Sequence, residues 1–134
     1  MNVRKITEDD WEDLVSWWDY WPEWKTPHRD MLPEGGTGGV IIEKDKTKVA
    51  ACFIFTSNSK TAWLEFVISN PHYKEKDRSE LIEQVITAAE TICKNLGYSF
   101  VYSVGRNKSL VNKYKKLGWW VDKKPSFEMY KYLK

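Results

Sequence analysis

The sequence predicts an α/β protein built on one mixed β-sheet with helices on both faces. Residues 63–68 form a short apolar run, rich in aromatic and β-branched side chains, that predicts a strand covered on both faces. Apolar residues recur at helical spacing over 81–96 and predict an amphipathic helix of about five turns. Open α/β sheets bind ligands where a strand turns into its helix, so residues 70–79 are the expected site.

Size and composition favour a single domain over residues 1–134. The chain has 134 residues, of which 42% are hydrophobic and 30% charged, enough for a packed core without disordered tracts. The acidic start argues against a signal peptide, and no apolar run is long enough for a bilayer, so we expect a cytoplasmic protein that does not enter a membrane. Cys52 and Cys93 are predicted to be buried, reduced thiols, and their spacing indicates no metal site.

The first part of the chain predicts a strand over residues 2–6 and then a helix. Thr7 and Asp10 fit a capping box at the start of that helix. The predicted core face comprises Trp11, Leu14, Val15 and Trp18. Four further aromatic residues fall off this face, and they either pack against the sheet edge or line a binding cleft: Trp17, Tyr20, Trp21 and Trp24.

The rest of the chain predicts further strands and one more helix. A turn at residues 45–47 joins strands at 40–43 and 49–56 in a hairpin. Gly97 ends the long helix, and a strand follows at 99–104. A short helix capped by Asn107 or Ser109 ends at Gly118. Strands at 119–121 and 127–133 bring the predicted, mostly antiparallel sheet to six or seven strands.

Charge is distributed unevenly along the chain. Acidic residues outnumber basic ones in residues 1–35, whereas basic residues predominate in residues 106–134. The basic end also carries aromatic residues between its lysines, a composition found in nucleic-acid-binding surfaces. No RNA-binding or helix-turn-helix signature accompanies it, so nucleic-acid binding ranks last among the functions considered.

Two segments resemble the GNAT superfamily of acetyl-CoA-dependent N-acetyltransferases. The first is VISNPHYKEKDRSELIEQVI at 67–86, which is similar to the family's strand, turn and helix at the coenzyme pyrophosphate. The second runs from Asn107 to Trp119 and matches the pattern Asn, six residues, Tyr, two residues, Leu-Gly-aromatic. The order of predicted elements extends the resemblance over nearly the whole chain.

The resemblance implies transfer of an acetyl group from acetyl-CoA to a primary amine of a small molecule or protein. It implies that the main chain of Val67, Ile68 and Ser69 holds the pantetheine arm. Tyr114 would protonate the departing thiolate, and Asn107 would contact the coenzyme. Tyr114 also shares a helical face with apolar residues, so core packing is the alternative for this side chain.

Glu65 is the candidate general base, because a carboxylate inside an apolar strand is costly unless it is paired or functional. The alternative is an ion pair with a nearby lysine or arginine. Trp21, Trp24 and His28 are the candidate acceptor-side residues, although His28, like His72, is a weaker candidate and is better explained as an exposed loop residue. A homodimer is a further expectation.

The predicted coenzyme loop departs from the family, because residues 73–79 contain no glycine. Lys74, Lys76 and Arg78 are expected to neutralise a diphosphate by side-chain charge, with Asp77 and Ser79 beside them. Alternatively, Asp77 and Glu80 form a capping box that occupies the helix N–H groups and repels phosphate. A GNAT-like interaction or structural module without catalytic activity is therefore the second functional hypothesis.

Overall fold

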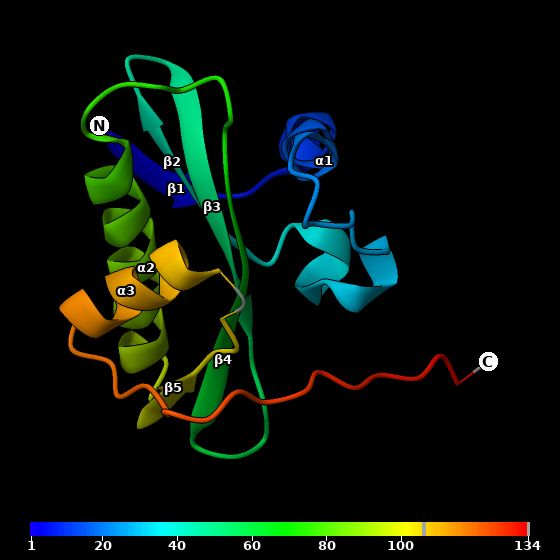
Figure 1. Cartoon of the computed structure of the whole chain (residues 1–134). Helices are drawn as coiled ribbons and strands as arrows, with labels where there is room; N and C mark the ends of the chain where they lie inside the picture. The colour runs from blue at the N-terminus through cyan, green and yellow to red at the C-terminus, as the bar shows by residue number, and fades with distance from the viewer. Residues whose placement is uncertain (106, 134) are drawn as a thin grey trace. The chain divides into compact units, whose positions relative to one another are not determined.

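The computed structural model describes residues 1–105 and 107–133, which fall into two compact units, residues 1–104 and 105–134. The first unit holds a five-stranded sheet in the order β1-β2-β3-β4-β5 (Figure 1). Its strands are β1 (Asn2–Lys5), β2 (Gly39–Lys44), β3 (Thr47–Phe55), β4 (Thr61–Ser69) and β5 (Phe100–Tyr102). The first four strands pair antiparallel, whereas β5 runs parallel to β4. The predicted mixed, mostly antiparallel sheet is confirmed.

Helices cover both faces of this sheet, as predicted. Helix α1 (Trp11–Tyr20) lies on one face and α2 (Arg78–Asn95) on the other (Figure 1). A short 3₁₀ helix at Glu8–Asp10 precedes α1 in the sequence, and two more follow it, at Arg29–Met31 and Pro33–Gly36. Among the described residues, no helix is long and apolar enough to cross a membrane.

The predicted sixth and seventh strands are wrong. The structure has no strand at 119–121 or 127–133, and Phe127, Tyr130 and Tyr132 are exposed there. An alternating apolar pattern forms a strand only when a neighbouring strand satisfies its backbone groups. Within the described part of this segment no such pairing occurs, so the pattern alone was insufficient.

The α1 face of the sheet contains the aromatic core. Leu14, Trp17 and Trp18 are buried, and the Trp18 ring stacks on Phe53 with centroids 6.1 Å apart. The prediction that Trp17 lies off the core face is wrong. Leu14, Trp17, Trp18 and Trp21 face the core. They have the predicted helical spacing, but the series begins three residues later than predicted.

The α2 face is more aliphatic. Helix α2 buries most of its predicted apolar side, although Leu96 at the end of that side is 61% exposed, and Gly97 follows with φ of 94°, the left-handed geometry that ends a helix. Cys52 and Cys93 are buried free thiols, and burial raises the pKa of both. Strand β4 was predicted to be covered on both faces, and none of its residues is exposed: Ala62, Leu64 and Ile68 are buried, Ile68 within the α1-face core, and the others are partly buried.

A buried ion cluster joins the start of α1 to the sheet. Asp10 is 1% exposed, and its carboxylate accepts two hydrogen bonds of 2.8 Å from Arg4 and contacts Lys48 Nζ at 2.8 Å. It also accepts from the Thr7 N–H at 2.8 Å, which confirms the predicted capping box. Burial alone would raise the Asp10 pKa, but the bonds from Arg4 and Lys48 outweigh it and hold that pKa well below its usual range.

The second unit is a short helix with its cap. Helix α3 (Lys108–Lys116) begins at Asn107, whose side chain accepts from the N–H groups of Ser109 and Leu110 at 2.8 and 3.2 Å. Gly118, with φ of 91°, follows its end. Tyr114 is buried, and its ring meets Trp119 edge-on with centroids 4.5 Å apart. The predicted helix, its Asn107 cap and its glycine end are confirmed.

Candidate functional site

Strand β4 carries a bulge near its end. Phe53 pairs with Glu65 and Ala51 with Ile68, so two steps along β3 correspond to three along β4. Phe66 lies at this irregularity with φ of 56°, a value that non-glycine residues rarely adopt. The extra residue bends the strand and changes the direction of the main-chain groups that follow it.

The bulge lies where β4 loses its partner on the β5 side. The parallel ladder consists of three pairs and ends at Trp63 and Tyr102. In the described residues of the first unit, no strand pairs with Val67–Ser69 on that side. The sequence prediction that this main-chain segment offers hydrogen-bonding groups to an extended ligand therefore remains compatible with the fold.

Glu65 extends from β4 toward the segment that follows β5. Its Oε1 accepts from Ser103 Oγ at 2.9 Å and from the Val104 N–H at 2.9 Å. The Glu65 side chain thus anchors the residues that follow Tyr102. In a continued β4–β5 ladder, main-chain hydrogen bonds would do this instead. Glu65 thus has a structural role at the point where β4 and β5 separate.

The loop before α2 does not form the predicted capping box. Asp77 precedes the helix, but its carboxylate makes no side-chain bond to the helix N–H groups. It accepts instead from the Tyr73 hydroxyl at 2.6 Å and pairs with the ammonium of Lys44. The Lys44 bond and then the Tyr73 bond lower the Asp77 pKa. The prediction was wrong because Tyr73, from the same loop, and Lys44, from β2, both bind this carboxylate.

Arg78 and Trp21 converge on the last residue of β4. Arg78 Nη2 donates to Ser69 Oγ at 2.6 Å, and Trp21 Nε1 donates to the Ser69 carbonyl at 3.3 Å. The Arg78 guanidinium lies 5.3 Å from the centre of the Trp21 ring, within cation–π range. Burial lowers the Arg78 pKa, and its Nε is buried without a hydrogen-bond partner in the described structure.

The other predicted coenzyme and acceptor residues are more dispersed. Lys74, Lys76 and Ser79 are exposed around the start of α2. Trp24 packs half-buried against the α1-face core, which favours the packing alternative for this residue. His28 is 73% exposed and caps a 3₁₀ helix through a bond from the Asp30 N–H, consistent with a loop residue.

Tyr20 was left open between packing and a binding cleft and was not among the predicted acceptor-side residues. It is half exposed, and its ring lies edge-on to Trp21 at 5.0 Å and to His72 at 5.7 Å. Tyr20 therefore continues the aromatic surface beside the end of β4. Its position directly before Trp21 and outside the core stripe was the available signal.

No known family model matches the sequence, and no curated protein matches it. Solved structures do match. The aminoglycoside 6'-N-acetyltransferase AAC(6')-IG from Acinetobacter haemolyticus is 16% identical, with TM-score 0.66 over 98% of this chain and 99% of that one. The ribosomal-protein-S18-alanine N-acetyltransferase of Escherichia coli is 11% identical, with TM-score 0.69 over 87% and 76%. The chain has the GNAT fold.

A third GNAT structure was solved with ligands. The N-acetylglutamate synthase of Neisseria gonorrhoeae, complexed with coenzyme A and N-acetyl-glutamate, is 12% identical with TM-score 0.68. The match covers 85% of this chain and 27% of that one. At such identities the comparison establishes the GNAT fold for this chain and leaves its substrates to be proposed.

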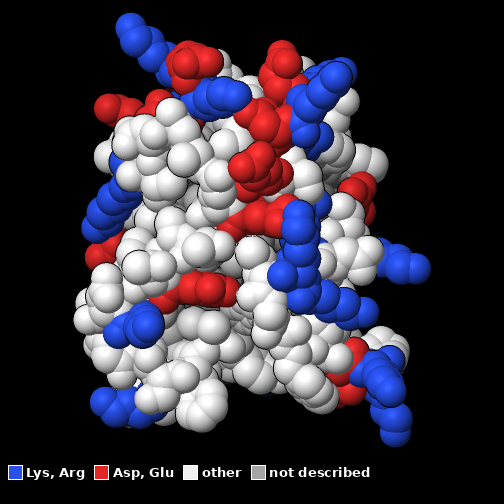
Figure 2. All heavy atoms as spheres, turned by 90° about the vertical axis from the view of Figure 1, so that its left-hand side faces the viewer, with Lys and Arg blue, Asp and Glu red and all other residues white. Residues whose placement is uncertain are grey.

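One face of the molecule carries charges of both signs. On the face seen from the α2 side of Figure 1, acidic and basic side chains of the described residues are interspersed (Figure 2). Nucleic-acid-binding surfaces usually concentrate lysine and arginine on one face. This face therefore does not have the composition expected of a nucleic-acid-binding surface.

Proposed function

We propose that this chain is an N-acetyltransferase that moves an acetyl group from acetyl-CoA to a primary amine of a small molecule or protein. The observation that carries the proposal is the bulged end of β4, which has no paired strand toward β5 beyond Trp63. Main-chain N–H and carbonyl groups at such an edge suit an extended, amide-containing arm. The GNAT fold of several acetyltransferases supports the same reading.

The residues at the start of α2 fit a diphosphate despite the missing glycines. Asp77 is turned toward Tyr73 and Lys44, so it does not occupy the N-terminal N–H groups of the helix. Those groups and the helix dipole favour an anion. Arg78 is a half-buried cation whose charge no described carboxylate pairs. Exposed Lys74 and Lys76 lie nearby in the sequence. Together with Arg78 they offer side-chain charge to the diphosphate, whereas the family brings the main chain of its glycines close to it.

Acetyl-CoA would supply a thioester, whose acyl carbon is open to attack by a neutral amine. The N–H groups of Val67–Ser69 are suited to hold the pantetheine arm and to stabilise a developing oxyanion. Tyr114, by the family resemblance, would donate a proton to the departing sulfur, and Asn107 would contact the coenzyme while its side chain caps α3. Glu65, or a water that it orients, would accept the proton of the amine.

On the acceptor side we propose the aromatic surface of Tyr20, Trp21 and Trp24, with His28 in the following loop. Trp21 contributes its ring face only, because its N–H is bonded to Ser69. Acidic residues lie in α1 and in the turn that follows it, including exposed Glu12 and Glu23. A cationic or aromatic amine matches this combination of charge and flat apolar surface.

Calorimetric titration with acetyl-CoA tests the proposal directly. We expect saturable binding, followed by release of free thiol when a panel of primary amines is added. Absence of heat at millimolar coenzyme would end the proposal. Titration with adenosine diphosphate tests the phosphate end separately and does not depend on the acyl group.

The second candidate is a GNAT-like interaction module without catalysis. Two observations favour it: residues 73–79 lack glycine, and Oε1 of Glu65 is already engaged by Ser103 and Val104. Replacing Asp77 and Arg78 together by glycine distinguishes the candidates. Coenzyme binding that appears only in this variant supports the module, whereas binding that weakens in it supports the enzyme.

A further inference from the structure

A cavity lies in the first unit at the opposite end of the sheet from the candidate site. Its volume is about 460 Å³, within the range of small-molecule sites. It is lined by Ile54, near the end of β3, and by Ile92 and Leu96 from the last turn of α2 and the residue after it. Ser69 and Arg78 lie at the other ends of β4 and α2, so the cavity is separate from the proposed acetyl-transfer site.

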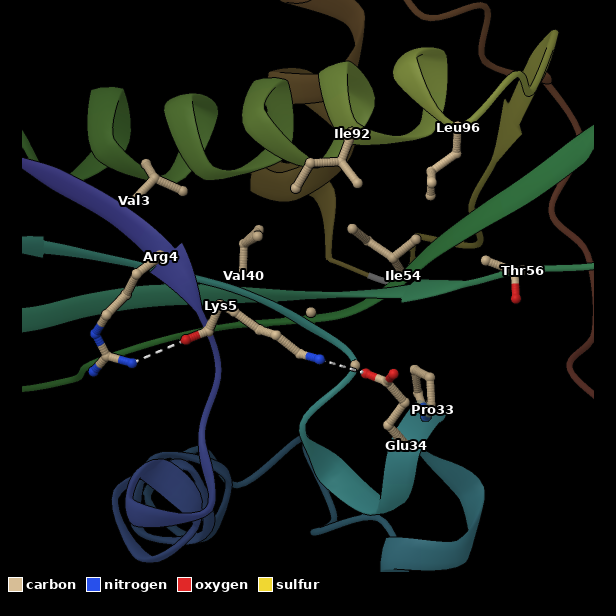
Figure 3. A pocket seen from close by; sticks show the side chains of 12 residues that line it. Val3, Arg4, Lys5, Pro33, Glu34, Val40, Ile54, Thr56, Ile92 and Leu96 are labelled. Carbon is tan, nitrogen blue, oxygen red and sulfur yellow. Dashed lines mark hydrogen bonds and ion pairs between the residues drawn. The ribbon is translucent and has the colours of Figure 1, made fainter.

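The interior of this cavity is apolar. Figure 3 shows Ile92 and Leu96 pointing from α2 toward Val40 and Ile54 on the sheet. Arg4, although it borders the cavity, points away from it, and its guanidinium is held by Asp10 and Glu43. Leu96 is 61% exposed, so part of the apolar wall faces solvent when nothing covers it. An apolar body of modest size matches this lining.

Two opposite charges stand at the edge of the cavity. Lys5 Nζ lies 3.1 Å from Glu34 Oε2, and the side chains are 63% and 60% exposed (Figure 3). A pair this exposed contributes little stability and separates readily. A carboxylic acid alone would meet repulsion from Glu34, and an amine alone would meet repulsion from Lys5. A zwitterion satisfies both charges.

The backbone of Glu34 is in the left-handed region, next to a tightly packed turn. Glu34 has φ of 52° and ψ of 36°, and Gly35 follows with φ of 63°. The Gly38 N–H donates to the Pro33 carbonyl at 2.9 Å, and a Cβ at Gly38 would lie 2.6 Å from Pro33 Cβ. Strained, non-glycine backbone that the surroundings hold in place is frequent at ligand sites.

We propose that this cavity binds a free apolar α-amino acid. The side chain of the amino acid enters between α2 and the sheet, its carboxylate pairs with Lys5, and its ammonium pairs with Glu34. The apolar lining thus contacts the side chain of the amino acid, and the two charged residues contact its ammonium and carboxylate groups. This binding site is independent of the proposed acetyl transfer.

Calorimetry or ligand-observed NMR with L-phenylalanine and L-leucine tests the proposal. Phenethylamine and 3-phenylpropanoate are the matched probes, because each lacks one of the two charges. We expect millimolar or tighter binding of the amino acids and about tenfold weaker binding of either single-charge analogue. Absence of binding at millimolar amino acid, or equal binding of an analogue, would overturn the proposal.

Three variants locate the binding. Lys5→Gln and Glu34→Gln each remove one charge, and Leu96→Asp places a charge on the apolar wall at an exposed position that should not impair folding. We expect each to weaken binding by about tenfold. Lys60→Gln and Asp45→Asn, at exposed positions elsewhere, are the controls and should bind normally.

A free amino acid is also a primary amine and therefore a conceivable acetyl acceptor. Binding that persists unchanged in Leu96→Asp would place it elsewhere and overturn the proposal. Binding that is lost in Leu96→Asp while acetyl-CoA titrates normally supports it. Titrating Leu96→Asp with acetyl-CoA as well therefore distinguishes a failure of the amino-acid site from a failure of the proposed acetyl transfer.

Discussion

The Tyr73 hydroxyl donates a 2.6 Å hydrogen bond to Oδ1 of Asp77, so the carboxylate that precedes α2 is held away from the helix N–H groups. Lys44 pairs with the other oxygen of the same carboxylate. Because the helix end has no side-chain cap, its N–H groups are available to an anion. The negative charge of Asp77 nevertheless stays close to them and opposes that anion.

Asp77→Asn should therefore tighten coenzyme binding. The substitution removes the negative charge near the helix start and releases Lys44 from its ion pair. We expect the dissociation constant for coenzyme A to fall about threefold to tenfold at low salt, with a smaller effect at high salt. Glu75→Gln, an exposed acid in the same loop, is the control. Equal effects of the two variants would show that only the net charge of the loop matters, and not the position of Asp77.

Arg78→Gln should weaken coenzyme binding. Arg78 is the half-buried cation at the start of α2, and its loss removes a charge-assisted contact to phosphate. We expect about a tenfold rise in the dissociation constant for coenzyme A by calorimetry. Lys94→Gln removes a cation from the last turn of the same helix and should leave binding unchanged. Unchanged binding in Arg78→Gln would contradict the phosphate role.

Glu65 can be tested by a matched pair of substitutions. Glu65→Gln keeps an oxygen that accepts from Ser103 and Val104, whereas Glu65→Ala removes it. If Glu65 is the base, both variants should lose about a hundredfold in kcat with amines of high pKa. If it only holds the segment after β5, Gln should resemble the natural protein while Ala loses about 1–2 kcal/mol of stability. Thermal melts and kinetics together separate these roles.

Tyr114→Phe should reduce turnover without unfolding the protein. The phenyl ring can keep the edge-on contact with Trp119, whereas the proton donor is lost. For a general acid we expect a decrease in kcat of about a hundredfold or more with KM little changed. Tyr130→Phe, at a 76% exposed position, is the control. Full activity of Tyr114→Phe would leave this residue a packing role only.

Asp10 should make the stability of the fold depend on acid pH. Its native pKa lies below the unfolded value of about 3.9, so its contribution is complete above that value and is lost as pH falls through the native pKa. Asp10→Asn leaves Arg4 and Lys48 without their shared carboxylate and should cost about 3 kcal/mol at pH 7.

Urea unfolding from pH 7 down to pH 2 measures this effect. The difference between Asp10→Asn and the natural protein should shrink below about pH 4, because Asp10 then becomes protonated in the unfolded chain. Asp9→Asn, an exposed neighbour, should change stability by no more than about 0.5 kcal/mol. A gap that stays constant with pH would show that the carboxylate charge of Asp10 does not stabilise the fold.

Local sequence signals predicted most of the first unit. The hairpin at Asp45 and Lys46, the capping box of Asp10, the apolar side of α2 and the glycine after it all depend on residues close together in the chain. For the same reason the Asn107 cap and Gly118 bounded α3 correctly. The single domain over residues 1–134 and the homodimer remain predictions.

Partners distant in sequence decided the rest. The Asp77 capping box failed because Lys44, from β2, pairs with that carboxylate. Glu65 was placed correctly in β4, but its bonds to Ser103 and Val104 depend on where β5 ends. The predicted C-terminal strands failed because pairing, which the pattern of one segment does not contain, is what makes a strand.

By itself the sequence determined the βα unit, the apolar side of α2 and the residue types around the start of α2, since periodicity, caps and turns are local properties. Only the tertiary structure decided that Trp21 and Arg78 meet at Ser69, that β4 carries a bulge, and that β4 and β5 pair over three residues alone. Each of these depends on contacts between segments that are separate in the chain, which local sequence patterns do not contain.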